Sequence, residues 1–337
     1  MRIKIGATGL VGIFIAAVFL AFGPKVMAAD QVKFRMDWII GGQYVPFYVA
    51  RDKGFFEKRG LDVTILEGRG SLQSATMVDA KQVDYSFGDF VTAVQVMSKG
   101  GKNRSIAVGT RPNGGVYIFL EGSGIKTPKD LEGKRFGTNP ADFGSVLLPA
   151  VAAASRIDAK KIIISTMEPA VRTPALFEGK IDFIAGANGS SIQRMAILGE
   201  KQGKKVRYLF FKDMGLKAYG HVLQAHEDLI KKNPDQLQRF VDAVFEALAW
   251  TVKNPKEGLE IFMKANPQIE RDITSAQMEA SLANAHDSVT KEHGLGYFEE
   301  AKVKASVEVA NKYLELSPSV DYKITYTNQF VRKTPRI

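Results

Sequence analysis

The feature that most constrains the fold is an alternation of short apolar segments with helical patterns, which runs through the first two thirds of the chain. Apolar segments that predict strands lie at residues 32–38, 61–66, 85–87, 105–110 and 116–120. Residues 45–58, 72–80 and 90–99 place apolar side chains at helical spacing, and Gly60 closes the first of these helices. Strands that alternate with helices form βα units, so the pattern predicts an α/β protein with mostly parallel sheets.

The same alternation begins again after a short capped turn at residues 127–131. Predicted strands lie at 135–138, 162–165, 181–185, 206–211 and 219–224, with predicted helices at 145–155, 170–177 and 192–198. From residue 226 the pattern is helical, with helices at 234–253, from 255 onward and at 275–290. The alternating tail of Tyr322, Ile324 and Tyr326 predicts an extended edge. Two successive α/β blocks predict two lobes with a ligand cleft between them.

The domain boundaries follow from this pattern. We assign residues 1–29 to a leader, 30–115 to the first part of one lobe, 116–220 to a second lobe, and 221–337 to a return to the first lobe with C-terminal helices. In the leader, Arg2 and Lys4 precede an apolar run over residues 5–22, and small residues follow near Ala28. This layout predicts a secretory signal peptide that is cleaved after Ala28 or Ala29. The alternative is an uncleaved anchor, since about 18 apolar residues can span a bilayer.

The composition excludes several classes of function. The chain has no cysteine, which rules out disulfides, thiolate metal sites and a cysteine nucleophile. Its four histidines are scattered, and neither a Gly-x-Ser-x-Gly nor a His-Glu-x-x-His motif is present. The leader carries three basic residues and no acidic one, so its loss lowers the formal charge from +10 to +7. These observations favour a binding protein over an enzyme, with no nucleic-acid partner, metal or cofactor.

Open α/β sheets bind ligands beyond the carboxyl ends of their strands, so the loops after the predicted strands are the places to search for a site. The loop after the first strand holds Asp37, Trp38, Tyr44 and Phe47 beside two adjacent glycines. Its aromatic rings offer flat apolar faces to a ring-shaped ligand, and Asp37 offers a hydrogen-bond acceptor. The alternative for Trp38 and Phe47 is that each packs in the core.

Later loops add candidates of the same kind. Gly70 and Ser71 open the helix after the second strand, where backbone N–H groups attract an acceptor, although Ser71 would also serve as a simple helix cap. Equivalent positions in later loops hold Asp89, Phe143, Ser145 and Asn188. Arg111 lies near the predicted crossing between lobes, where it could bind an anion or be an ordinary surface arginine. We predict that these residues enclose a ligand or form hydrogen bonds to it.

Several motifs resemble those of a known family. They are Asp37-Trp38, Phe47-Tyr48-Val49-Ala50, Lys53-Gly54-Phe55-Phe56, Gly60-Leu61-Asp62-Val63 and Val83-Asp84-Tyr85-Ser86-Phe87-Gly88, with residues 130–137 and 177–182 in the second block. The chain resembles the solute-binding proteins of ABC importers, in the branch that binds thiamine-pyrimidine precursors, sulfonates, taurine or nitrate. The resemblance implies a type II periplasmic-binding-protein fold, in which two α/β lobes joined by two hinge strands close around one small molecule.

The resemblance also implies a mode of action. It implies a monomeric periplasmic receptor that captures a small-molecule nutrient and delivers it unchanged to an ABC permease in the inner membrane. The first loop is most similar to that of the thiamine-pyrimidine branch, which predicts a planar ligand stacked on aromatic rings. Gly41, Gln43 and Tyr44 stand where that branch has asparagines and a histidine, so the ligand need not be the pyrimidine precursor.

Three other functions remain open from the sequence. A binder of a sulfonate, taurine or nitrate would hold its anion with Gly70 and Ser71, helped by Arg69 or Arg111. An enzyme of the same fold that synthesises the pyrimidine is disfavoured, because the cysteine cluster of those enzymes is absent. A sensor would present its bound ligand to a signalling receptor instead of a permease, and the residues do not distinguish this from transport.

Overall fold

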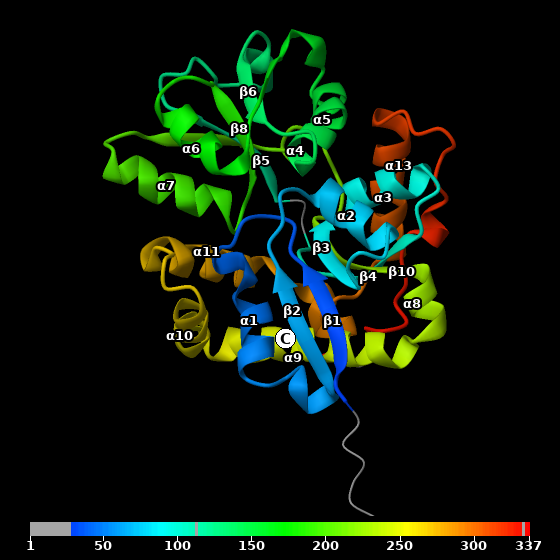
Figure 1. The fold of residues 1–337 in the computed structure, drawn as a ribbon. Coiled ribbons are helices and arrows are strands. Elements are labelled where there is room, and N and C mark those ends of the chain that lie inside the picture. The colour runs from blue at the N-terminus through cyan, green and yellow to red at the C-terminus, as the bar shows by residue number, and fades with distance from the viewer. Residues whose placement is uncertain (1–27, 112–113, 332–333) are drawn as a thin grey trace, which may run out of the picture.

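The computed structural model describes residues 28–111, 114–331 and 334–337, which form two α/β lobes (Figure 1). Each lobe is built on a five-stranded sheet. The strand order is β2-β1-β3-β10-β4 in the first sheet and β7-β6-β8-β5-β9 in the second. The predicted two-lobed α/β architecture is confirmed, and the predicted leader lies outside the described residues up to position 27.

The first lobe begins with three βα repeats. Its parallel strands are β1 (Asp30–Arg35), β2 (Leu61–Leu66) and β3 (Tyr85–Asp89). They are followed by η1 (Gly42–Tyr44), α1 (Val45–Asp52) and η2 (Glu57–Arg59), by α2 (Ser71–Asp79), and by α3 (Phe90–Ser98). In β1, Val32 and Phe34 are buried while Gln31 and Lys33 are exposed, as expected of a strand with one face on the core. β4 (Asn103–Val108) completes this part of the lobe.

The second lobe repeats this plan. Its elements are β5 (Gly115–Leu120), η3 (Pro128–Leu131), β6 (Arg135–Thr138), α4 (Phe143–Val146), α5 (Leu148–Ala154), η4 (Ala159–Lys161), β7 (Ile163–Thr166), α6 (Pro169–Phe177), β8 (Phe183–Ala187), α7 (Ser191–Lys201) and β9 (Val206–Phe210). β6 runs parallel to β7 and β8, whereas β5 runs antiparallel to β8 and β9. Each sheet therefore has a parallel half and an antiparallel half.

The chain crosses between the sheets twice. Residues 109–114 lead from β4 to β5, and residues 211–220 lead from β9 to β10 (His221–His226). β10 enters the first sheet antiparallel, between β3 and β4. The prediction of mostly parallel sheets is therefore wrong, because the strand that enters each sheet from the other lobe runs against its neighbours.

Helices complete the first lobe after the second crossing. They are α8 (Glu227–Lys232), α9 (Pro234–Lys253), α10 (Pro255–Ala265), α11 (Arg271–Asn284), α12 (Ser288–His293) and α13 (Glu300–Tyr313). α9 begins where the sequence predicts it, because Asn233 accepts a hydrogen bond from the Gln236 backbone N–H and Pro234 occupies the first turn. No helix among the described residues is long and apolar enough to cross a membrane.

Several predicted elements differ from the structure. The helix expected at 275–290 is two helices, α11 and α12. The helix expected at 45–58 ends at Asp52, because Gly54 adopts a positive φ of 74° and turns the chain into η2. The helix expected at 145–155 is divided at Leu147 into α4 and α5. The first strand ends at Arg35 rather than at residue 38, so the residues after it form a loop. The tail is not an extended edge: residues 322–324 form the 3-10 helix η5 (Tyr322–Ile324), and Tyr326 forms an isolated bridge to Ser105.

The two lobes are in direct contact. The Leu72 backbone N–H donates to the carbonyl of Ala141 in the other lobe at 3.2 Å. On α11, the Gln277 side-chain amide donates to the carbonyl of Ser190 at 2.9 Å. Lys201 on α7 is 2.7 Å from Glu270, which lies directly before α11. The structure therefore has the lobes closed on each other.

Candidate ligand-binding site

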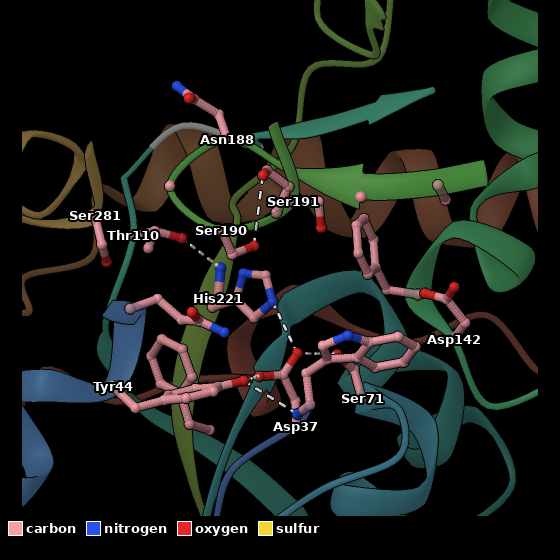
Figure 2. A pocket seen from close by; sticks show the side chains of 18 of the residues that line it. Asp37, Tyr44, Ser71, Thr110, Asp142, Asn188, Ser190, Ser191, His221 and Ser281 are labelled. Carbon is pink, nitrogen blue, oxygen red and sulfur yellow. Dashed lines mark hydrogen bonds and ion pairs between the residues drawn. The ribbon is translucent and has the colours of Figure 1, made fainter. Parts of the chain in front are cut away.

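A cavity of about 60 Å³ lies between the lobes (Figure 2). From the first lobe it is lined by residues that include Asp37, Trp38, Tyr44, Ser71, Phe87 and His221. From the second lobe it is lined by residues that include Asp142, Phe143, Arg172, Asn188, Ser190 and Ser191. A cavity needs about 10–15 Å³ of such volume to hold one water molecule, so this closed cavity has room for a small molecule. We call it the ligand cavity.

Asp37 is the centre of a hydrogen-bond cluster on the first-lobe side of the ligand cavity (Figure 2). The Tyr44 hydroxyl donates to Asp37 Oδ1 at 2.8 Å, and the Ser71 hydroxyl donates to Oδ2 at 3.1 Å. His221 Nε2 lies 3.0 Å from the same Oδ2. Both oxygens of this buried carboxylate are thus engaged, so Asp37 holds three polar side chains in position around the cavity.

The Asp37–His221 pair sets the charge of the site. Burial alone would raise the pKa of Asp37, but the charge of His221 and the hydrogen bonds hold that pKa below its ordinary value. Burial alone would lower the pKa of His221, but the charge of Asp37 and their hydrogen bond leave it above its ordinary value. The pair therefore favours an ionised carboxylate and a protonated imidazole. A protonated imidazole has two N–H donors, of which Asp37 takes one.

Aromatic rings fix the orientation of His221. The Phe87 ring stacks on it with centroids 5.3 Å apart and planes 18° apart. Phe143, from the second lobe, approaches it edge-on at 5.9 Å and 70°. Because the imidazole lies between rings from both lobes, its position depends on lobe closure.

The second lobe places a buried ion pair on the opposite wall. Arg172, 5% exposed, donates through Nη1 to Asp142 Oδ2 and through Nη2 to the carbonyl of Ala185, the latter at 2.7 Å. Its guanidinium carbon lies 4.8 Å from the centroid of the Trp38 ring in the first lobe. This cation–π contact joins the lobes across the cavity and shows that a planar group fits against the Trp38 face.

Two helices begin at the cavity from opposite lobes. Ser190 and Ser191 line it at the start of α7, and Ser71 lines it at the start of α2. Figure 2 shows Asn188, Ser190 and Ser191 on one side of His221 and Asp37 on the other. The first backbone N–H groups of a helix have no partner within it, and the helix dipole is positive there. The cavity therefore suits a solute with hydrogen-bond acceptors or negative charge.

Six of the residues singled out from the sequence line the ligand cavity: Asp37, Trp38, Tyr44, Ser71, Phe143 and Asn188. The structure brings them together, and their contact with a ligand stays a prediction. Tyr44 differs from the expected stacking platform. Its side chain is buried, its hydroxyl donates to Asp37, and it also accepts a hydrogen bond from the Trp38 backbone N–H at 3.1 Å. Tyr44 therefore supports the carboxylate.

Phe47 and Gly70 lie outside the lining of the ligand cavity. The Phe47 ring packs in the core, 4.7 Å from the Phe34 centroid, which corresponds to the alternative interpretation of that residue. Gly70 has a φ of 147°, and a Cβ there would lie 2.2 Å from the carbonyl oxygen of Ala141. Gly70 therefore allows the two lobes to approach closely. This role replaces the predicted contact between Gly70 and the ligand.

Asp89 and Ser145 also lie outside that lining. Asp89 is buried and caps α3 by accepting a hydrogen bond from the Thr92 backbone N–H at 2.9 Å. Ser145 lines a separate hollow on the surface together with Pro149. Their predicted contacts with the ligand are corrected because one side chain is engaged in a helix cap and the other faces a different space.

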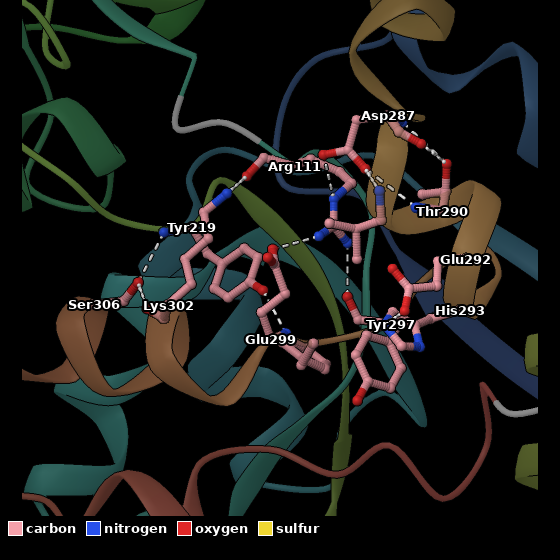
Figure 3. Close-up of polar contacts among 12 residues, drawn as sticks. Arg111, Tyr219, Asp287, Thr290, Glu292, His293, Tyr297, Glu299, Lys302 and Ser306 are labelled. Carbon is pink, nitrogen blue, oxygen red and sulfur yellow. Dashed lines mark hydrogen bonds and ion pairs between the residues drawn. The ribbon is translucent and has the colours of Figure 1, made fainter.

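Arg111 is neither a surface residue nor an anion site (Figure 3). Its side chain is 2% exposed, and its Nε and Nη2 donate to Asp287 and Glu299 at 2.8 and 2.6 Å. Nη1 donates to the carbonyl of Tyr297 at 2.7 Å. Its donors are thus engaged by the C-terminal part of the first lobe, so Arg111 anchors the first crossing. Both interpretations made from the sequence are corrected.

The second crossing is anchored to the same region. The Tyr219 backbone N–H donates to the Ser306 hydroxyl at 2.9 Å, and the Tyr219 hydroxyl accepts from the Glu299 backbone N–H at 2.8 Å. Lys302 lies over the Tyr219 ring at 4.7 Å and donates to the carbonyl of Arg111 at 2.9 Å. Both crossings between the lobes are therefore fixed to residues 287–306.

Sequence reasoning missed His221 and Arg172. A search at the carboxyl ends of strands passes over His221 because it begins a strand. Because β10 runs antiparallel to β3, His221 at the start of β10 pairs with Asp89 at the end of β3. His221 therefore lies at the edge of the sheet where the parallel strands end. Arg172 is the one charged residue in the nine-residue helix α6, and nothing in its local sequence indicates that it is buried, because that depends on its ion pair with Asp142.

The charge on Asp89 gives a testable pH dependence. Burial raises the pKa of Asp89 to about 6, with a smaller contribution from Asp37, against the opposing effects of His221 and Thr92. Because the pKa of this carboxyl is higher in the folded state than in the unfolded state, folding favours its protonated form. The resulting stabilisation is complete below the ordinary pKa of 3.8 and is lost as the pH rises to about 6. The Asp89→Asn variant keeps the helix cap, and we expect it to avoid this loss of about 3 kcal/mol.

Urea unfolding of the wild type and of Asp89→Asn, measured between pH 4 and pH 7, checks this expectation. The difference in unfolding free energy between the two proteins should change with pH in favour of the variant. Asp158→Asn is the matched control, because Asp158 caps η4 in the same way at an exposed position. A difference that is constant across this pH range would contradict the raised pKa.

The fold and the enclosed cavity define the class of protein. Two α/β lobes, linked by two crossings and closed around a polar cavity, form a periplasmic-binding-protein fold of type II. The chain belongs to the NMT1/THI5-like family, whose family model matches residues 42–258. The family resemblance inferred from the motifs is thereby confirmed.

Two curated relatives differ in what their names say they do. The chain is 24% identical over 324 residues to the 4-amino-5-hydroxymethyl-2-methylpyrimidine phosphate synthase THI13 of Saccharomyces cerevisiae, covering 90% of this chain and 89% of the relative. It is 25% identical over 310 residues to the riboflavin-binding protein RibY of Chloroflexus aurantiacus, covering 90% and 86%. The relatives of this chain thus include one protein named as an enzyme and one named as a riboflavin-binding protein.

Solved structures resemble this one over most of their length. The periplasmic aliphatic sulphonate-binding protein SsuA of Escherichia coli matches with a TM-score of 0.68 and 16% identity, covering 88% of this chain and 97% of that one. The ligand-binding component of an ABC-type import system of Staphylococcus aureus also matches with a TM-score of 0.68 and 16% identity, covering 91% and 100%. At these identities the likeness establishes the fold.

Proposed function

We propose that this protein is an exported receptor that captures a small ring-bearing organic solute and passes it, unchanged, to an ABC permease in the inner membrane. The observation that carries the proposal is the ligand cavity, to which both lobes contribute aromatic and hydrogen-bonding groups. A solute that contacts both walls binds the closed arrangement more tightly than the open one, so binding favours closure. The leader and the import-system protein among the structural neighbours support export and transport.

The cavity chemistry favours a planar solute with polar edges. Trp38 and Phe143 supply aromatic groups from opposite lobes. His221 and the hydroxyls of Ser71 and Ser191 surround this space with hydrogen-bonding groups. A heteroaromatic ring would use both kinds of contact at once. The riboflavin-binding relative is named for a ligand of that kind.

The two tryptophans of the chain make a sharp test possible. Trp38 lies in the ligand cavity, while Trp250 lies on α9 with Lys53 over its ring at 4.6 Å, so both have a cation partner. We expect Trp38→Ala to weaken binding of 4-aminopyrimidines about tenfold or more, because a stacked ring contact is worth on the order of 1 kcal/mol beyond the buried area. Trp250→Ala, the matched control, should bind like the wild type.

Calorimetric titration of the three proteins gives these affinities, and a rise in melting temperature with the solute gives an independent readout. In a Trp250→Phe protein the only tryptophan fluorescence comes from Trp38, so the solute should change the emission. Equal affinities in Trp38→Ala and wild type, with no change in emission, would overturn the ring-stacking site.

A small anion is the second candidate, favoured by the helix starts at Ser71 and Ser191 and by the nearby cation of Arg172. A sulphonate-binding protein is among the structural neighbours. The two candidates differ in the same titration. An alkanesulfonate or nitrate would bind without dependence on Trp38, whereas a ring compound requires it.

Catalysis is distinguished from capture by the fate of the solute. Relatives of this chain are named pyrimidine phosphate synthases, whereas the proposed receptor returns its solute chemically intact. Incubation with 4-aminopyrimidines, flavins and sulfonates, followed by denaturation and mass spectrometry, should recover each compound at its original mass. Recovery of a new compound would show that the cavity carries out a reaction.

A further inference from the structure

An apolar space adjoins the ligand cavity inside the first lobe. It has a volume of about 40 Å³ and shares Gln43, Phe87, Thr110 and Ser281 with the lining of the ligand cavity. Figure 2 shows Thr110 and Ser281 on the side of the ligand cavity that lies away from Asp142. We call this space the rear chamber. Its remaining lining includes Phe47, Leu223, Val244, Phe245, Leu248 and Ala285.

The rear chamber is chemically different from the ligand cavity. Apart from the residues that the two spaces share, the side chains that line it are apolar, and Leu223, Val244 and Phe245 are almost fully buried. Protein cores are packed to a density that leaves few spaces larger than a water molecule. The polar side chains of its lining lie only on the side shared with the ligand cavity, so the rest of the chamber offers water few hydrogen-bond partners. An apolar group that entered the chamber would gain packing contacts and lose its own exposure to water.

Gln43 stands where the two spaces meet. Its side chain lines both of them, and its Oε1 atom is buried with no hydrogen-bond partner among the described residues. Buried polar atoms without a partner are rare in folded proteins. This oxygen lies beside the backbone of Gly41, so the rest of the Gln43 side chain forms the boundary between the two spaces.

We propose that the solute has two parts, a polar head in the ligand cavity and an apolar arm of about two to four carbon atoms that enters the rear chamber. This inference deepens the proposed function and rests on it. It defines the solute class as a ring compound or anion with a short aliphatic or fused apolar extension.

Two series of compounds test the arm independently of the head. One is 4-amino-2-methylpyrimidine with hydrogen, methyl, ethyl, propyl or butyl at position 5, and the other is the alkanesulfonates from methane to hexane. In the series whose shortest member binds, calorimetry should show affinity rising about fourfold per methylene until the chamber is filled. Each further carbon should then weaken binding.

Three variants localise this dependence. Ala285→Leu fills the rear chamber and should remove the rise with arm length, while the shortest compound binds within about twofold of wild type. Leu248→Ala enlarges the chamber and should shift the best arm to a longer one. Ala301→Leu is the matched control, because Ala301 is an exposed residue of α13. Unchanged binding of the shortest compound shows that a variant has kept its fold.

The outcomes separate this inference from the proposed function. If short compounds bind and affinity does not depend on arm length, the rear chamber is not a ligand subsite, while the receptor function stands. The same conclusion follows if Ala285→Leu weakens the short and long compounds equally. If no member of either series binds, the proposed solute classes fail, and the inference fails with them.

Discussion

A protein that carries both Asp287→Asn and Glu299→Gln is expected to lose about 3 kcal/mol of unfolding free energy. These changes remove both carboxylates that face the guanidinium of Arg111, which is 2% exposed. The guanidinium would keep hydrogen bonds to the new amides but would be a buried cation without a counter-charge. We expect a loss at the lower end of the range for a broken buried pair, because both carboxylates are 40% exposed and water already reaches them.

Urea unfolding monitored by circular dichroism measures this loss. Glu260→Gln is a matched control for an ion pair at the surface, because Glu260 and its partner Arg271 are both exposed, and little change is expected there. Arg111→Met should destabilise less than the double variant, since it removes the buried charge itself. If the double variant were as stable as the control, the carboxylates would not be compensating Arg111.

Asp37→Asn is expected to disrupt the centre of the ligand cavity and to lower the unfolding free energy by about 3 kcal/mol. Asp37 accepts hydrogen bonds from Tyr44, Ser71 and His221, and hydrogen bonds to a charged acceptor are worth about 1 kcal/mol more than those to a neutral one. The amide also removes the negative charge that keeps the pKa of His221 above its ordinary value. Burial then dominates, so the pKa of His221 should fall below 6.5.

Proton NMR titration of the histidine C2–H signals follows the pKa of His221 directly, with the His221→Gln variant providing the assignment. Asp62→Asn is the control, because Asp62 is exposed and has one hydrogen-bond partner, Gln31, at 3.0 Å. A pKa of His221 that stays above 6.5 in Asp37→Asn would mean that another group provides its counter-charge. Asp89 is the other carboxylate whose charge raises that pKa.

Local signals in the sequence were sufficient for much of the fold. Leu61–Leu66 is a strand and Pro234–Lys253 a helix with the predicted bounds, because Gly60 turns the chain before the strand and the Asn233-Pro234 pair caps the start of the helix. The direction of β5 and β10 was not predicted. It depends on which lobe the preceding strand belongs to, and no local pattern carries that information.

The sequence likewise predicted some residues of the candidate site and not others. Asp37 and Ser71 were found because they follow strands, and strand ends share one edge of a sheet. The burial of the Arg111 side chain depends on its ion pairs with Asp287 and Glu299, which lie more than 170 positions later in the sequence. Arg172 likewise takes its place from an ion pair with Asp142 and from the Trp38 ring in the other lobe. Charged side chains like these are defined by distant partners, which a single sequence does not pair.

The strand order also sets the sequence in which the lobes can be completed during synthesis. All five strands of the second sheet lie between residues 115 and 210, in one uninterrupted stretch of chain. The first sheet lacks β10, which belongs between β3 and β4, until residue 226 has been made. A growing chain adds residues from the N-terminus. The lobe that starts first is therefore finished last, and a chain interrupted after residue 210 would have one complete sheet and one with a gap between β3 and β4.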